Sequence, residues 1–114
     1  MSDEEVCELV VTAPDADWLI EFGRQLVVDH LAASVHNLTP IRSIYEWHGK
    51  LYDRTESRAA IHTRTALIGR IMRRLDDGHP YEVPGVFALP IVGTSVNYRV
   101  WILDQTHPSD DASD

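Results

Sequence analysis

The sequence predicts a mixed α+β domain, and three patterns lead to this prediction. Apolar residues recur at helical spacing over residues 15–32 and again after Thr65, which indicates two amphipathic helices. Residues 34–63 lack that spacing, are rich in β-branched and aromatic residues, and contain Gly49 near their middle, which favours a long hairpin. Short apolar runs at residues 9–12 and 86–89 favour two further strands.

Capping and turn residues divide the first half of the chain. Pro14 ends the first strand, and Asp15 is a good N-cap for a helix that we expect to reach about residue 32. The hairpin is predicted as strands over residues 35–47 and 50–63 with a turn at His48-Gly49. At about 3.3 Å per residue these strands are longer than a small sheet needs. The excess should therefore project, and another chain should cover its edges.

The second half of the chain carries similar signals. Thr65 is expected to cap the second helix, and Gly78 lies where a glycine commonly ends one. The strand over residues 86–89 is almost wholly apolar, so we expect burial on both of its faces. Asn97 is expected to cap a short last helix. Residues 1–106 are thus predicted to form one domain, followed by an acidic, disordered tail over residues 107–114.

The predicted order is strand, helix, strand, strand, helix, strand and short helix. This is the split βαβ order of ferredoxin-like folds, in which a four-stranded antiparallel sheet carries two helices on one face. We therefore expect an α+β, ferredoxin-like sandwich with a long β-hairpin. The arrangement alone determines no function.

Composition and charge exclude several classes of function. The net charge is −8, but most of the excess lies near the two ends of the chain, so the body is nearly neutral. The one dense basic cluster, Arg70, Arg73 and Arg74, lies close to two aspartates, so we expect no nucleic-acid partner. No run approaches the ~18 apolar residues of a membrane span, so we expect no membrane partner. The acidic N-terminus and the single cysteine predict a cytoplasmic protein.

The chain has no motif for nucleotide binding or nucleophilic catalysis, so we expect that it is not an enzyme. Cys7 lies beside the N-terminal tail and is expected to play no part. None of the six histidines forms an i, i+4 pair, which argues against a metal site within one chain but leaves open a weak site shared between chains. His79 is the best single candidate for a metal ligand, because it lies at a helix end beside a segment stiffened by prolines. The alternative is that His79 only interacts with helix carbonyls.

A second candidate site combines the hairpin with the segment between Pro80 and Pro84. Its aromatic and polar side chains would form one wall of a cleft between subunits, or would pack across strands at an interface. The residues concerned are Arg42, Ser43, Tyr45, Trp47 and Lys50 of the hairpin, and Tyr81 and Glu82 of the segment.

Several long stretches of the sequence form a distinctive series. They are Val-Val-Thr-Ala-Pro-Asp (10–15), Leu-Ala-Ala-Ser-Val-His-Asn (31–37), Ile-Arg-Ser-Ile-Tyr-Glu-Trp-His-Gly-Lys (41–50), His-Pro-Tyr-Glu-Val-Pro (79–84) with Ala-Leu-Pro (88–90), and the last helix (97–102). Together they resemble the CutA family of divalent-cation tolerance proteins. The resemblance covers roughly residues 8–105 and is specific because the stretches follow one another in the family's order.

The resemblance implies a PII-like homotrimer in which each hairpin reaches across to a neighbouring subunit. It also implies that a divalent cation such as copper, or a small ligand, binds at the clefts between subunits. His62 stands where many members have a lysine that faces this cleft, so the electrostatics of the cleft should depend on pH.

The chain departs from the family at its soft metal ligands. Ser34 and Val11 stand where some members have cysteines, and Gly78 where some have a second histidine. Only His79 remains of that set, so copper binding is expected to be weak or absent. Two other functions stay open: a PII-like module that senses an anionic metabolite through Arg42, Lys50 and Arg64, and a stable trimeric scaffold with unused clefts.

Overall fold

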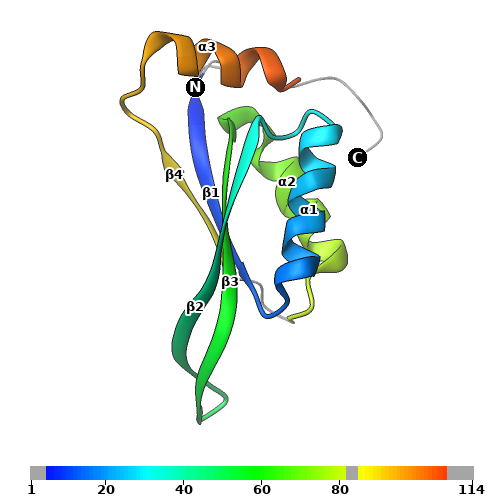
Figure 1. Ribbon diagram of the computed structural model, residues 1–114, viewed down its shortest axis with the longest axis vertical. Helices are drawn as coiled ribbons and strands as arrows, with labels where there is room; N and C mark the ends of the chain where they lie inside the picture. The colour runs from blue at the N-terminus through cyan, green and yellow to red at the C-terminus, as the bar shows by residue number, and fades with distance from the viewer. Residues whose placement is uncertain (1–4, 82–84, 108–114) are drawn as a thin grey trace.

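The computed structural model describes residues 5–81 and 85–107 and forms one antiparallel sheet with the strand order β2-β3-β1-β4 (Figure 1). The strands are β1 (Val6–Ala13), β2 (Ser34–Trp47), β3 (Lys50–Arg64) and β4 (Gly85–Pro90). The helices are α1 (Ala16–Val28), α2 (Ile68–Gly78), which follows a 3₁₀ turn over Thr65–Leu67, and α3 (Val96–Gln105). The predicted α+β class and order of elements are confirmed.

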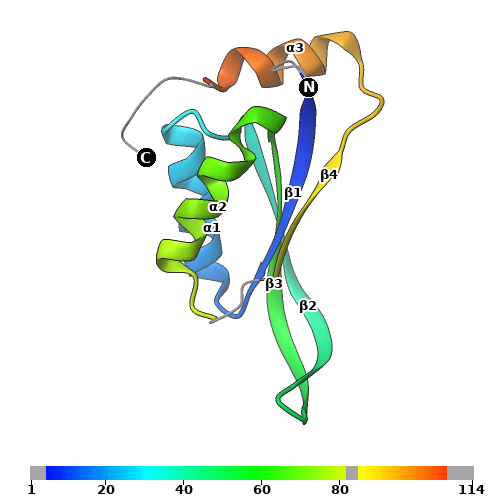
Figure 2. The same cartoon turned by 180° about the vertical axis from the view of Figure 1, so that it is seen from behind.

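One face of the sheet is covered by α1 and α2, as Figures 1 and 2 show from opposite sides. Because successive side chains of a strand point to opposite faces, alternate residues of the central strands form the core. Leu9, Val11 and Ile61 have no exposed surface and pack with Leu19 of α1 and Ile71 of α2.

The other face of the sheet is open except at one end, where α3 lies across it (Figure 1). There Ile102 of α3 packs with Val6 and Ala33 to make a second, smaller core. The helix is held at its C-terminal end by Arg64 of β3, whose guanidinium donates to the carbonyls of Leu103 at 2.6 Å and Thr106 at 3.0 Å. These contacts place α3 directly over the ends of β1, β2 and β3.

The β2–β3 hairpin projects beyond the rest of the molecule (Figure 2). The longest dimension of the molecule, hairpin included, is 43 Å. His48 and Gly49 at its tip both have positive φ angles, 53° and 78°, which the two-residue turn of a tight hairpin requires. The predicted turn is confirmed. The projecting part exposes Ile44 and Leu51, with 66% and 71% of their surfaces accessible.

Two predictions about α1 had different outcomes. Asp15 is the N-cap as expected, and its carboxylate accepts hydrogen bonds from the amides of Asp17 and Trp18. The helix ends at Val28, however, rather than near residue 32. The chain leaves the helix because His30 adopts a positive φ of 62° and the amide of Leu31 turns back to the Leu26 carbonyl.

Three predictions about the remaining elements were wrong. Ser95, not Asn97, caps α3, since its hydroxyl accepts from the amide of Tyr98. Thr65 begins the 3₁₀ turn and makes no side-chain capping bond to the amides of α2. β4 is not buried on both faces: it is an edge strand, and Phe87 and Leu89 keep 49% and 45% of their surfaces exposed.

The first strand begins earlier than expected, at Val6, and therefore includes Cys7. Cys7 is 2% exposed and belongs to the main core, so it packs as a small apolar residue. Burial raises the pKa of its thiol. Of the predicted tail over residues 107–114, only His107 lies within the described residues.

A tight contact between α1 and the sheet generates a first test. A Cβ added to Gly23 would lie 2.8 Å from Cγ1 of Val35, a β-branched side chain with little freedom to move. We expect Gly23→Ala to lower the free energy of unfolding by roughly 1 to 2 kcal/mol, because overpacking outweighs the gain in helix propensity. Urea unfolding at a fixed protein concentration measures the change.

Gly69→Ala provides the matched control, since it adds the same methyl group to a helix. Its Cβ would meet only Arg73 Nη1 at 3.6 Å, an ordinary contact. We expect the free energy of unfolding of this variant to rise by up to ~1 kcal/mol, because alanine has the higher helix propensity. Equal effects of the two substitutions would contradict the packing described here.

Candidate functional site

The candidate site starts from a row of residues that lie opposite one another on adjacent strands. In the strand register, Ser34 of β2 pairs with His62 of β3, His62 pairs with Glu8 of β1, and Glu8 pairs with Leu89 of β4. The row lies on the face opposite α1 and α2, because its neighbours Leu9 and Ile61 are in the core. The fold thus brings together residues from all four strands.

Tyr98 of α3 completes this row from above. Its hydroxyl lies 2.5 Å from His62 Nδ1, and His62 Nε2 lies 2.8 Å from Glu8 Oε2. An ionised carboxylate only accepts hydrogen bonds, so His62 donates from Nε2 to Glu8. Its Nδ1 then accepts from Tyr98 when the ring is neutral and donates when the ring is charged. Glu8, His62 and Tyr98 form a continuous chain of hydrogen bonds, which we call the Glu8–His62–Tyr98 triad.

Two further side chains extend the triad towards β2. Ser34 Oγ lies 3.4 Å from the Tyr98 hydroxyl and 3.3 Å from His36 Nε2. The rings of His36 and His62 lie 5.1 Å apart. Ser34, which stands where some family members have a cysteine, is therefore a hydrogen-bonding residue within a polar network.

The triad forms one wall of a pocket of about 470 Å³. Leu89, Pro90 and Ile91 give the pocket an apolar side, and the segment before α3 closes it with Thr94 and Ser95. A pocket with few polar groups among apolar ones is typical of small-ligand sites.

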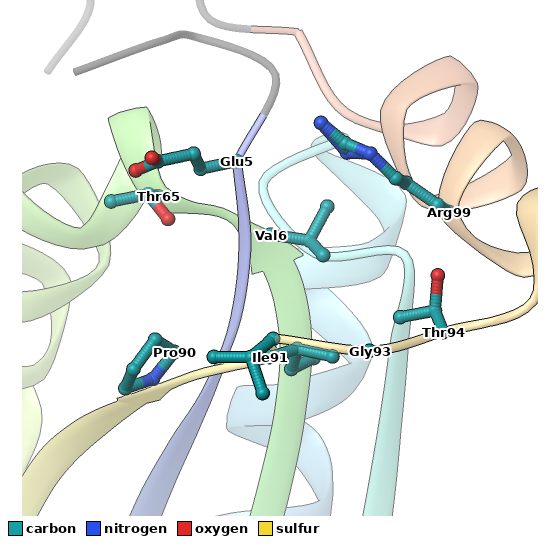
Figure 3. A pocket seen from close by; sticks show the side chains of 9 residues that line it. Glu5, Val6, Thr65, Pro90, Ile91, Gly93, Thr94 and Arg99 are labelled. Atoms are coloured by element: carbon teal, nitrogen blue, oxygen red, sulfur yellow. The ribbon is translucent and has the colours of Figure 1, made fainter.

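A second pocket, of about 540 Å³, shares Pro90, Ile91, Gly93 and Thr94 with the first (Figure 3). Its charged residues are Glu5, before β1, and Arg99 of α3. The view in Figure 3 shows both side chains among the residues that line this pocket.

The predicted hairpin residues lie at the opposite end of the molecule from the triad (Figure 1). Arg42 makes a two-bond ion pair with Asp53, at 2.6 and 2.9 Å, which lowers the pKa of Asp53 and raises that of Arg42. Tyr45 stacks on Tyr52 at 5.3 Å, and the Lys50 ammonium lies 5.2 Å from the centre of the Tyr52 ring.

The other two predicted hairpin residues are surface residues in this chain. Ser43 lies opposite Arg54 in the register, and the Trp47 ring packs edge-on against His48. Trp47 nevertheless remains exposed, as does much of the hairpin surface. The three pockets described among residues 5–81 and 85–107 do not include these side chains.

Tyr81 links the segment after α2 to the base of the hairpin. Its hydroxyl donates a short hydrogen bond to Glu56, a buried carboxylate of β3, and accepts one from Arg54 Nη1 at 3.2 Å. Burial, followed by the hydrogen bond to Glu56, raises the pKa of the Tyr81 phenol well above its usual range. Glu82, the other predicted residue of this segment, lies outside the described residues.

His79, the predicted metal ligand, has both ring nitrogens in hydrogen bonds. Nε2 lies 2.8 Å from the Thr12 carbonyl, and the amide of Tyr81 donates to Nδ1 at 3.0 Å. The carbonyl can only accept, so Nε2 carries the proton and the ring is neutral. A metal ion would have to displace one of these bonds. His79 as a ligand stays a prediction.

The structure thus places the predicted residues that it describes in four groups. His62 lines a pocket, Arg64 holds the end of α3, and the hairpin residues lie far from both. His79 and Tyr81 contact each other in the segment after α2, and Tyr81 also bonds to Arg54 at the base of the hairpin. Sequence reasoning missed Glu8, Tyr98 and Arg99 as pocket residues. The sequence does carry a signal for Glu8, which is a lone carboxylate within a mostly apolar strand.

The environment of Tyr81 generates a second test. The folded state holds the phenolic proton more tightly than the unfolded chain does. This contribution to stability is complete below the ordinary tyrosine pKa of about 10 and is lost as the pH rises above it. We expect the ultraviolet titration difference between the wild type and Tyr81→Phe to have its midpoint well above pH ~10. A midpoint near the ordinary value would contradict the described contact with Glu56.

Within residues 5–81 and 85–107, no three or more His, Cys, Asp and Glu side chains lie together in a way that could hold a metal ion. The helices of these residues are too short or too polar to span a membrane.

Comparison with known proteins places this geometry in a family. The chain is 34% identical over 105 residues to a divalent-cation tolerance protein CutA of Pectobacterium atrosepticum, covering 90% of this chain and 96% of that protein. It is 35% identical over 96 residues to a chloroplastic CutA protein of Arabidopsis thaliana, covering 84% of this chain but only 53% of the plant protein. The chain therefore spans about half the length of that relative.

The solved structures agree with the sequence relatives. The crystal structure of CutA1 from Oryza sativa superposes with a TM-score of 0.88 at 30% identity, covering 92% of this chain and 96% of that one. The model of the CutA1 divalent ion tolerance protein family matches residues 7–105, nearly the whole of the described fold. This chain belongs to the CutA1 family of divalent ion tolerance proteins.

Proposed function

We propose that the chain acts as a homotrimer in the tolerance of divalent cations, and that it binds a cation or small ligand at clefts between its subunits in the cytoplasm. The observation that carries the proposal is the apolar surface of the hairpin and of the open sheet face. The relatives named as divalent-cation tolerance proteins support the role in metal tolerance.

The exposed apolar surface supports assembly because it serves no purpose in a monomer. Large apolar side chains lie uncovered on three elements that border the open face. They are Ile44 and Leu51 of the hairpin, Phe87 and Leu89 of β4, and Val100 and Trp101 of α3. Exposed apolar surface of this kind favours contact with a protein partner. β2 and β4 are also the edge strands, with unpaired backbone groups that a neighbouring hairpin could cover.

The Glu8–His62–Tyr98 triad supports a cation or small ligand at the cleft. Glu8 Oε2 and His62 Nε2 lie 2.8 Å apart at the wall of the 470 Å³ pocket. A carboxylate and an imidazole suit a borderline ion such as Zn²⁺ or Cu²⁺, which would replace the hydrogen bond that His62 Nε2 donates to Glu8. Two donors fall short of the three or four of a tight site, so a neighbouring subunit would supply the rest.

The anion-sensing alternative receives less support from the described contacts. Arg42 is bound to Asp53, and Arg64 to the carbonyls at the end of α3. Neither guanidinium lines the three pockets described among residues 5–81 and 85–107.

Light scattering during size exclusion tests the assembly. We expect three times the chain mass for the wild type and a shift towards monomer for Leu51→Asp, because a charge would be buried at the interface. Val28→Asp is the matched control, since Val28 is 62% exposed but lies at the end of α1, away from the open face. A monomeric wild type would remove the trimer and every shared site.

Calorimetric titration with Cu²⁺ and Zn²⁺ tests the cleft site. We expect Glu8→Gln and His62→Gln each to weaken binding by about tenfold or more, because each removes one donor. His79→Ala distinguishes the other candidate: a loss confined to this variant would assign the ion to His79. Unchanged binding in all three variants would remove the cation from the clefts.

A further inference from the structure

The six histidines, all within the described residues, differ in whether their ring nitrogens are free. Both nitrogens of His62 and of His79 are hydrogen-bonded, and His36 Nε2 contacts Ser34. The remaining rings are those of His48, at the hairpin tip, and of His30 and His107, which lie beside each other.

His30 and His107 come from distant parts of the chain that the fold joins. His30 follows α1, and His107 follows α3. Figure 1 shows the C-terminal ends of these two helices next to each other, and Figure 2 agrees from behind. Two hydrogen bonds run between the segments in opposite directions. The amide of His107 donates to the His30 carbonyl at 3.1 Å, and His30 Nδ1 lies 3.2 Å from the Gln105 carbonyl.

These bonds also set the protonation of His30. The Gln105 carbonyl can only accept, so Nδ1 carries the proton and the lone pair of a neutral ring lies on Nε2. No described residue hydrogen-bonds to that Nε2. A histidine whose second nitrogen donates to a backbone carbonyl has the arrangement typical of a metal ligand.

The spacing of the two rings fits one shared ion. Their centres lie 4.8 Å apart, and the ring planes make an angle of 58°. With a metal–nitrogen distance of about 2.1 Å and a ring centre ~1 Å behind the nitrogen, two imidazoles on one tetrahedral ion have centres roughly 5 Å apart. His36 and His62 have a similar spacing of 5.1 Å, but both nitrogens of His62 and the Nε2 of His36 already have hydrogen-bond partners. Free nitrogens therefore distinguish the His30–His107 pair.

We propose that His30 and His107 form a surface site for a borderline divalent cation, Cu²⁺, Ni²⁺ or Zn²⁺, at the junction of α1 and α3. Imidazole favours these ions, whereas Mg²⁺ and Ca²⁺ prefer oxygen. With two protein ligands, the ion keeps open positions for water, so it is held weakly and exchanges readily. The site lies within one chain and does not depend on the clefts between subunits.

Calorimetric titration of the full chain with Zn²⁺ and with Cu²⁺ tests the proposal. We expect His30→Asn and His107→Gln each to weaken one class of binding by about tenfold or more. Asparagine is chosen at position 30 because it tolerates the positive φ there. Circular dichroism checks that both variants fold, and Mg²⁺ should give no comparable heat.

His48→Gln is the matched control, because it removes an exposed histidine that has no histidine partner. The affinity of His48→Gln for Zn²⁺ and Cu²⁺ should stay within about twofold of the wild-type value. The proposal is overturned if His48→Gln weakens binding as much as the other two variants, or if neither His30→Asn nor His107→Gln changes it.

The Leu51→Asp variant separates this site from the cleft site. If that variant is monomeric, the His30–His107 site should keep its affinity, whereas a site shared between subunits should be lost. A second readout is thermal: the rise in Tm with added Zn²⁺ should disappear in His107→Gln, because an ion that binds only the native state stabilises it. A Tm rise that persists unchanged in His107→Gln would contradict the site.

Discussion

The two-sided pairing of β1 is the constraint on which the rest of the structure depends. β1 pairs with β3 along one edge and with β4 along the other, so within residues 5–81 and 85–107 it joins the hairpin to the C-terminal strand. Its successive side chains therefore point to opposite faces of the sheet. Leu9 and Val11 anchor the core beneath α1 and α2, while Glu8 points to the opposite face and meets His62. A shift of one residue would exchange these faces and destroy both the core and the triad.

The open face of the sheet carries the Glu8–His62–Tyr98 triad and the pocket beside it. α3 covers only one end of it, and its placement by Ile102 and Arg64 creates two adjacent pockets beside the triad. The remainder of the face, together with the hairpin, exposes apolar side chains. A monomer would leave that surface in water, at a cost of about 25 cal/mol for each Å² of apolar area. The proposed assembly and the proposed ligand site would therefore use the same face.

Local sequence patterns predicted the fold well, but they did not predict contacts between residues that are distant in sequence. The Asp15 cap and the His48-Gly49 turn depend on a few neighbouring residues, so the sequence displays them directly. The cap of α3 was misplaced by two residues, because both Ser95 and Asn97 are competent caps and packing decides between them. β4 was expected to be buried, since an apolar run does not reveal whether a strand is central or at an edge. The triad joins residues up to 90 positions apart, which no local pattern reports.

By itself, the sequence determined the class, the order of the elements, the long hairpin and the membership in the CutA1 family. These follow from periodicity, turn chemistry and extended motifs, all of which depend on residues that are close together in the sequence. Only the tertiary structure decided which histidines have a free nitrogen. His79, the candidate on sequence grounds, has both nitrogens bonded, while His30 and His107 lie together with a nitrogen available. The reason is that hydrogen-bond partners such as the Thr12 and Gln105 carbonyls are assigned by strand register and helix packing, not by adjacent residues.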